Sequence, residues 1–151
     1  MKFSIRQATI EDIDQIQLIR RMVKENILLN PQLVSNEDCK TFITKRGKGW
    51  VALSNDEILG FAIADLKDNN IWALFVHPNH EKKGIGKKLH DTMLEWYFDY
   101  GKSKVWLSTD PGTRAEKFYK KQGWTRKVKL PNGEIKFEMT SDEWRNIKHS
   151  S

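Results

Sequence analysis

Residues 71–89, IWALFVHPNHEKKGIGKKL, constrain the fold of this chain more than any other stretch. Residues 71–76 are an apolar run with the β-branched and aromatic content of a buried strand, which Pro78 ends. Gly84 and Gly86 follow within a cluster of lysines, and an apolar period of helical spacing begins beside them. A strand, a glycine turn and a helix N-terminus direct unpaired backbone N–H groups and the positive end of a helix dipole toward one point. The sequence therefore predicts an anion site, and we expect this turn to hold a phosphorylated cofactor.

The length and the composition limit the class of protein. A chain of 151 residues suits one domain with a sizeable core, so we expect residues 1–151 to form a single domain. No stretch approaches the ~18 apolar residues of a membrane span, and the N-terminus is polar where a signal peptide is apolar. The single cysteine, Cys39, excludes an internal disulfide and a cysteine-based metal site. These features predict a cytoplasmic protein with no metal and no membrane partner.

The formal charge of +6 favours anionic partners, which include nucleic acid, an acidic membrane surface and a polyphosphate ligand. The lysines are spread over the whole chain with acidic residues between them, which is typical of a solvated surface. A basic nucleic-acid-binding domain is therefore an alternative. Because the sequence contains no nucleic-acid-binding motif, we expect no nucleic-acid partner.

Turn and capping signals divide the chain into short elements. Thr9 and Ser35 are each followed, at the position of a capping box, by an aspartate, which predicts a helix N-terminus at each. Gly47 and Gly49 are expected to end the second of these helices. We expect strands at residues 3–7, 50–53, 58–66, 71–76, 104–109, 125–129 and 134–139, helices at 9–29, 35–46, 84–101 and 115–122, and a last capped turn from Ser141.

This order, β-α-α-β-β-β-α-β-α-β-β, predicts a mixed α/β (α+β) fold. We expect a central, mostly antiparallel sheet with helices on both faces, because successive short strands pair through hairpins and one helix crosses from the fourth strand to the fifth. If those two strands are parallel neighbours, Gly84 lies at the carboxyl end of the fourth strand, where open sheets bind ligands.

Two motifs carry a family resemblance. Residues 81–87, EKKGIGK, follow the fourth strand and are similar to an acyl-CoA-binding pattern of Gln or Arg, two residues, Gly, one residue, then Gly or Ala. Residues 115–124, AEKFYKKQGW, are similar to a later motif with an alanine, an aromatic-Tyr pair and a Gly-aromatic ending. A lone Gly-x-Gly is a weak signal, but two motifs at the expected separation are a specific one. With this order of elements, nearly the full chain resembles the GNAT N-acetyltransferase superfamily.

The resemblance implies a GNAT-like acyl-CoA N-acyltransferase fold and transfer of an acetyl group from acetyl-CoA to a primary amine of a small molecule or peptide. The amine would attack directly in a ternary complex, without a covalent enzyme intermediate or a metal. Tyr119 matches the tyrosine near the cofactor sulfur and is the expected general acid, because a phenol of pKa about 10 is protonated at neutral pH. A core aromatic beside Phe118 is the alternative role for Tyr119. The residues expected to contact the cofactor are Leu74, Phe75, Val76, Glu81, Lys82, Lys83, Gly84, Ile85, Gly86, Lys87, Lys88, Arg114 and Phe118.

The sequence offers no single proton acceptor. Asp65, late in the third strand, and His77, just past the fourth, are the nearest candidates, directly or through a water. A buried pocket that lowers the pKa of the substrate amine is the alternative. Backbone N–H groups near Phe75 and Val76 are expected to stabilise the oxyanion.

Several positions depart from the family pattern. Glu81 stands where Gln or Arg begins the phosphate loop, so its carboxylate either points to solvent or is offset by Lys82 and Lys83. Gly112 replaces an asparagine that often precedes the second motif, and Asn70 replaces a carboxylate at the start of the fourth strand. Because Asn70 removes an expected base, a CoA-sensing domain without catalysis is an alternative function.

The acceptor site is expected near the first helix. Arg20, Arg21 and Lys24 lie where this family often forms part of that site, although a solvated helix face is the alternative. Trp72 either belongs to the core or faces the acceptor cleft. The sequence leaves open the identity of the acceptor and whether the protein forms a homodimer.

Overall fold

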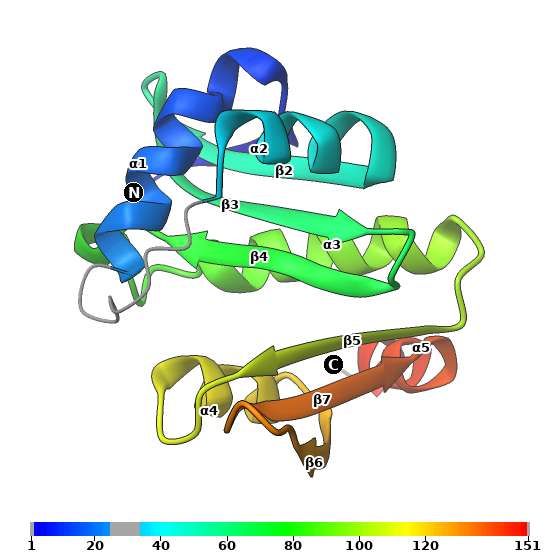
Figure 1. The fold of residues 1–151 in the computed structure, drawn as a ribbon. Coiled ribbons are helices and arrows are strands. Elements are labelled where there is room, and N and C mark those ends of the chain that lie inside the picture. The colour runs from blue at the N-terminus through cyan, green and yellow to red at the C-terminus, as the bar shows by residue number, and fades with distance from the viewer. Residues whose placement is uncertain (1, 25–33, 151) are drawn as a thin grey trace.

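The computed structural model describes residues 2–24 and 34–150, and Figure 1 shows their arrangement. Its centre is a seven-stranded sheet of order β1-β2-β3-β4-β5-β7-β6. Neighbouring strands are antiparallel except β4 and β5, which are parallel. The strands are β1 (Ser4–Gln7), β2 (Gly47–Ser54), β3 (Glu57–Asp65), β4 (Asn70–Val76), β5 (Lys104–Thr109), β6 (Thr125–Lys129) and β7 (Ile135–Thr140). The predicted mixed fold with a mostly antiparallel sheet is confirmed.

Helices cover both faces of the sheet. They are α1 (Ile13–Lys24), α2 (Asn36–Thr41), α3 (Ile85–Asp99), α4 (Arg114–Lys121) and α5 (Ser141–Ser150), with the short segments η1 (Ile10–Asp12), η3 (Phe42–Arg46) and η4 (Pro78–His80). The helices α1 and α2 pack on one face of β2, β3 and β4, and α3 packs on the other (Figure 1). The layer of α3 continues with α4 and α5, which bury Tyr119 and Trp144 in the same core as β5 and β7.

The capping residues that the sequence predicts are present at the first helices. The Ser35 Oγ accepts a hydrogen bond from the Asp38 amide at 3.0 Å, and the Asp38 carboxylate accepts one from the Ser35 amide at 3.0 Å. The Asp12 carboxylate accepts a hydrogen bond from the Thr9 amide at 2.8 Å. These contacts satisfy donors that a helix N-terminus would otherwise leave unpaired. The predicted continuation of α1 to residue 29 lies outside the described residues.

The helical segment ends before Gly47, as the sequence predicts, and Gly47 and Gly49 also belong to the strand that follows. The π-helical turn η3 ends at Arg46, and both glycines belong to β2. A Cβ on Gly47 would lie 1.8 Å from the Ala64 carbonyl oxygen, and one on Gly49 would lie 2.9 Å from Ile43 Cγ2. The missing side chains therefore allow β2 to approach β3 and η3 closely.

A full helix, α5, stands where a short capped turn is expected from Ser141. Trp144 is 5% exposed, and its indole N–H donates to Glu95 of α3 at 3.3 Å. Lys148 donates to the same carboxylate at 2.5 Å. These contacts with α3 stabilise the helix, and a local capping signal cannot show them.

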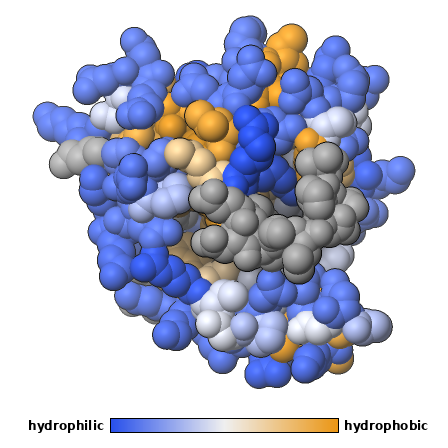
Figure 2. Space-filling view, turned by 60° about the vertical axis from the view of Figure 1, so that its left-hand side comes forward, coloured by the Kyte–Doolittle hydropathy of each residue, from blue (hydrophilic) through white to orange (hydrophobic). Residues whose placement is uncertain are grey.

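The face of the molecule in Figure 2 is mostly hydrophilic, with separate apolar patches. The exposed large hydrophobic side chains of the described residues are Ile10, Leu18, Met22, Tyr100 and Val128. Within residues 2–24 and 34–150, no helix has the length and apolar character that crossing a bilayer would require.

The strands β4 and β5 meet at one end and separate at the other. Of their described residues, Asn70 and Trp106 alone form a register pair. The Trp106 amide donates to the Asn69 carbonyl, and the Trp106 indole donates to the Asp68 carbonyl, both at 3.0 Å. Toward their carboxyl ends the two strands diverge (Figure 1). The seam is therefore open on the side where the sequence predicts a ligand.

Candidate active site

An open cleft of about 280 Å³ lies between the diverging ends of β4 and β5. One wall is β4, and the other comes from β5, the turn after it and α4. The cleft brings together three residues that the sequence assigns to the site, Leu74, Phe75 and Tyr119. Arg20, Asn70, Trp72, Asp110 and Glu134 also line it.

The turn before α3 has the features of an anion site. Gly84 precedes the helix with a φ of +84°, which a side chain would strain. None of the described side chains caps this helix, and its first turn has no acidic residue. Ile85 is 1% exposed, and its side chain packs in the core beneath the turn. A Cβ on Gly86 would lie 3.5 Å from Val76 Cγ2, so the first helical turn lies against the end of β4. The first-turn amides thus fit the phosphates of a cofactor.

The lysines around this turn differ in whether a carboxylate already pairs with them. All four, Lys82, Lys83, Lys87 and Lys88, are exposed. Lys87 forms an ion pair at 2.7 Å with Asp91, one turn further along α3. Burial acts to raise the pKa of Asp91, but hydrogen bonds from His90 and Lys87 outweigh burial and hold that pKa below its ordinary value. Lys82, Lys83 and Lys88 are therefore better placed than Lys87 to attract a phosphate.

Glu81 forms an ion pair with Arg114, the first residue of α4. The side chains of Glu81 and Arg114 are 38% and 68% exposed, so the pair lies at the surface between the turn and α4. The sequence predicts that Glu81 points to solvent or is offset by Lys82 and Lys83, whereas Arg114 is the partner in the structure. Two residues predicted to contact the cofactor therefore contact each other.

Tyr119 belongs both to the core and to the cleft. It is 7% exposed, and its ring centroid lies 5.3 Å from that of Phe118 and 5.6 Å from that of Trp124. Burial raises the pKa of the Tyr119 phenol above its ordinary value. The phenol is therefore neutral, and able to donate its proton, throughout the physiological pH range.

Neither predicted base lines the cleft. Asp65 is 1% exposed and accepts hydrogen bonds from the Arg46 guanidinium at 3.1 and 2.7 Å. It also accepts two backbone amides of the next turn, so its carboxylate closes the connection from β3 to β4. The His77 Nδ1 accepts the Asn79 amide at 3.0 Å and caps η4. We therefore do not propose Asp65 or His77 as the proton acceptor.

Asp110 and Glu134 are cleft residues that sequence reasoning missed. Both line the cleft from the β5 side. The Glu134 carboxylate accepts hydrogen bonds from Ser108 at 2.9 Å and Asn132 at 3.1 Å. In the sequence, Asp110 and Glu134 are far apart, and each lies in or beside a predicted turn. The pairing of β5 with β7 brings both residues to the same cleft.

Arg20 and Trp72 lie in the cleft, as one of the alternatives for each residue predicts. The Arg20 guanidinium carbon is 5.1 Å from the centroid of the Trp72 ring, and Trp72 stacks on Phe42 at 3.9 Å. Arg21 is exposed instead, and the side chain of Lys24 is outside the described part of the chain.

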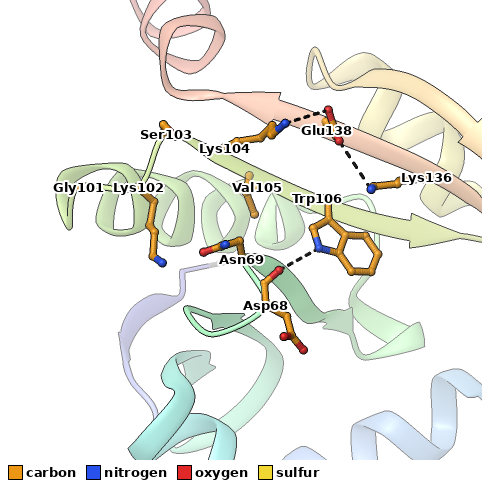
Figure 3. A pocket seen from close by; sticks show the side chains of 10 residues that line it. All are labelled: Asp68, Asn69, Gly101, Lys102, Ser103, Lys104, Val105, Trp106, Lys136 and Glu138. Carbon is orange, nitrogen blue, oxygen red and sulfur yellow. Dashed lines mark hydrogen bonds and ion pairs between the residues drawn. The ribbon is translucent and has the colours of Figure 1, made fainter.

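A larger cavity of about 490 Å³ lies at the closed end of the same seam (Figure 3). Its lysines have partners: Lys104 and Lys136 approach Glu138 at 4.0 and 3.7 Å, and Lys102 donates to the Leu66 carbonyl at 2.9 Å. The described lining of this cavity includes none of the predicted site residues. The cleft at the open end is therefore the better candidate for chemistry.

The chain is similar in sequence to known acetyltransferases. The model of the Acetyltransferase (GNAT) family matches residues 13–124. An uncharacterized ycf52-like N-acetyltransferase of Prochlorococcus marinus is 32% identical over 81 residues. That alignment covers 54% of this chain and 39% of the relative, so the chain spans less than half of the relative's length.

Solved structures share the fold. PaiA N-acetyltransferase from Thermoplasma acidophilum, in complex with coenzyme A, has a TM-score of 0.81 and 19% identity, over 93% of this chain and 99% of that one. YncA from Salmonella typhimurium, with its cofactor acetyl-CoA, has a TM-score of 0.75 and 19% identity, over 91% and 93%. At these identities the structures show likeness of fold alone, whereas the family match covers most of the chain. This chain belongs to the GNAT acetyltransferase family.

Proposed function

We propose that this protein transfers an acetyl group from acetyl-CoA to a primary amine, by direct attack in a ternary complex. The cleft between β4 and β5 carries the proposal, because it places Tyr119 and the backbone of β4 around one space, at the end of β4 that leads into the Gly84 turn. Family membership supports acyl transfer from CoA. Relatives solved with coenzyme A or acetyl-CoA support the choice of cofactor.

The proposed cofactor site follows from the turn and the cleft. The first-turn amides of α3, with Lys82, Lys83 and Lys88, would hold the pyrophosphate. Leu74 and Phe75 line the cleft along which the rest of the cofactor would lie. When bound, acetyl-CoA supplies the activated thioester, and the protein's part is to orient it and to move protons.

The β3–β4 ladder indicates which backbone amide would stabilise the oxyanion. His77 donates its amide to the Leu59 carbonyl of β3 at 2.8 Å. Amides of successive residues in a strand point to opposite edges, so the Val76 amide points away from β3, toward the edge from which β5 has diverged. We therefore assign Val76, rather than Phe75, as the oxyanion donor.

Three proton transfers complete the proposed reaction. Asp110 and Glu134 line the cleft and are the proposed acceptors of the first proton, from the substrate ammonium, directly or through a water, so that the substrate attacks as a neutral amine. Tyr119 would donate a proton to the departing thiolate, which its buried, neutral phenol permits. The second proton that the nitrogen loses as the amide forms would return to the Tyr119 oxygen and restore the phenol.

Free thiol is the signal that tests this function. The protein is incubated with acetyl-CoA and a panel of primary amines, and we expect CoA release that requires both substrates. Thermal stabilisation by CoA with no release above the buffer rate would favour the CoA-sensing alternative, for which Asn70 in place of a carboxylate is the motivating observation. Oligonucleotide binding that weakens steeply with salt, without CoA binding, would favour the nucleic-acid alternative.

A further inference from the structure

We propose that the acceptor carries a carboxylate as well as its primary amine, and that Arg20 binds this carboxylate. The inference rests on the proposed acetyl transfer and adds the chemical class of the acceptor. That class is a small amino acid or a similar amino-carboxylate.

Arg20 has hydrogen-bonding capacity that the described chain does not use. Its Nη1 is buried and has no hydrogen-bond partner within residues 2–24 and 34–150. Burial lowers the pKa of Arg20, and no carboxylate within residues 2–24 and 34–150 is a cause that opposes this lowering. Because Arg20 lines the cleft, an anion bound in the cleft would accept hydrogen bonds from its guanidinium.

Aromatic rings hold the guanidinium in place without supplying a hydrogen-bond acceptor. Its central carbon lies 5.1 Å from the Trp72 ring centroid and 5.5 Å from the Phe75 ring centroid. Trp72 is itself held by its stacking on Phe42. The guanidinium is thus positioned before a ligand arrives, and its planar set of N–H donors matches the two oxygens of a carboxylate.

The remaining polar groups of the cleft suit the other end of an amino acid. Asp110 and Glu134 face the cleft from the β5 wall, opposite the β4 wall on which Arg20 packs. Among the described residues that line the cleft, the charged groups are one cation and two carboxylates, so a singly charged carboxylate fits better than a doubly charged phosphate.

Paired acceptors separate this inference from the function on which it rests. Each of several amino acids is compared with its carboxamide by kcat/KM at saturating acetyl-CoA. The wild-type enzyme should prefer the carboxylates by roughly 10- to 100-fold, the typical effect of a hydrogen-bonded charge pair. Arg20→Gln should remove that preference by lowering kcat/KM for the amino acids and leaving the carboxamides within about 3-fold. Arg21→Gln, on the exposed neighbour, should change neither.

Other outcomes would overturn the inference. If Arg20→Gln loses kcat/KM equally for an amino acid and its carboxamide, or has a raised KM for acetyl-CoA, Arg20 does not bind the acceptor carboxylate. A wild-type preference for carboxamides or for phosphorylated amines would contradict it without any variant. If Arg20→Gln does not fold, Arg20→Lys replaces it. This variant keeps the charge but lacks the planar set of N–H donors, so its preference for carboxylates over carboxamides should be smaller than that of the wild type. No CoA release with any amine would contradict the proposed function itself, and this inference with it.

Discussion

At the scale of single residues, Tyr119 combines a buried ring with a place in the cleft. Tyr119→Phe removes only the hydroxyl, so we expect kcat to fall roughly 100-fold or more while KM for acetyl-CoA changes little. Because burial raises the pKa of the phenol, kcat should show no loss from Tyr119 ionisation up to about pH 10. Steady-state kinetics across pH measure both effects. Tyr100→Phe, at a tyrosine that is 61% exposed, is the control, and an unchanged kcat in Tyr119→Phe would exclude the acid role.

The Glu81–Arg114 ion pair sets two opposite charges beside the predicted phosphate site. Glu81→Gln removes the repulsive carboxylate and frees Arg114, so the Kd for CoA should fall roughly 2- to 10-fold at low salt. Arg114→Gln leaves Glu81 unpaired and should raise the Kd by a similar factor. Titration calorimetry at two ionic strengths measures the change, which should shrink as salt is added. If both variants bind CoA as the wild type does, neither side chain faces the pyrophosphate.

Sequence reasoning selects candidate site residues that belong to local motifs and misses candidates that the fold brings in. The Gly84 turn before a helix and the burial of Tyr119 beside the cleft were predictable, because a glycine turn and an aromatic-Tyr pair are contiguous patterns. Glu134 enters the cleft only because β5 pairs with β7. Asp65 has the position of a base in the sequence, but Arg46 lies beside it in the fold and engages its carboxylate.

At the scale of elements, the approach of β2 to β3 depends on Gly47. A Cβ there would lie 1.8 Å from a backbone oxygen, so Gly47→Ala should lower the free energy of unfolding by about 1–3 kcal/mol or more. Gly86→Ala is the matched control: its Cβ would make an ordinary 3.5 Å contact, and in a helix it should be neutral or stabilise by up to about 1 kcal/mol. Urea unfolding compares the two variants. Equal stability of Gly47→Ala and the wild type would contradict this packing of the strands.

The entry into α1 should make stability depend on pH through Asp12. Hydrogen bonds from Arg6 lower the pKa of Asp12 most, burial opposes them, and the Thr9 amide adds to the lowering. A lowered folded-state pKa gives stability that is present above the unfolded-state pKa, near 3.8, and is lost as pH falls through the folded-state value. Asp12→Asn should therefore cost about 0.5–2 kcal/mol at neutral pH and progressively less below about pH 4.

Urea unfolding at several pH values measures this dependence. Asp14→Asn, at an exposed position of the same turn, should have a smaller effect. If Asp12→Asn lowers the free energy of unfolding by the same amount at neutral pH and at about pH 3, the charge of Asp12 does not stabilise the N-terminus of α1.

The elements with strong local signals were predicted well. The bounds predicted for β5 and β6 agree with the structure, and Ser35 caps α2 as expected. Distant contacts decide what the sequence could not show. Gly47 ends a helix as predicted, but its close approach to the β3 backbone was not predictable, and α5 extends beyond a turn because Trp144 and Lys148 contact Glu95 of α3.

At the scale of the whole molecule, the site exists because the sheet opens between β4 and β5. The order of elements left open whether these strands are parallel neighbours, and the structure shows that they are. It could not predict that they separate after Asn70, because the separation depends on how the two halves of the sheet pack against α3, α4 and α5. The single-domain organisation and the cytoplasmic location stay predictions, and whether the protein forms a homodimer stays open.

The central claim is direct transfer of an acetyl group from acetyl-CoA to an amine. The most direct measurement quantifies free CoA, acetylated amine and acetylated protein by mass spectrometry during the first turnovers, with the best amine of the panel. We predict that CoA and acetylated amine appear together in equal amounts, with no acetyl group on the protein. CoA release without acetylated amine, or an acetylated protein that forms before the product, would contradict the claim.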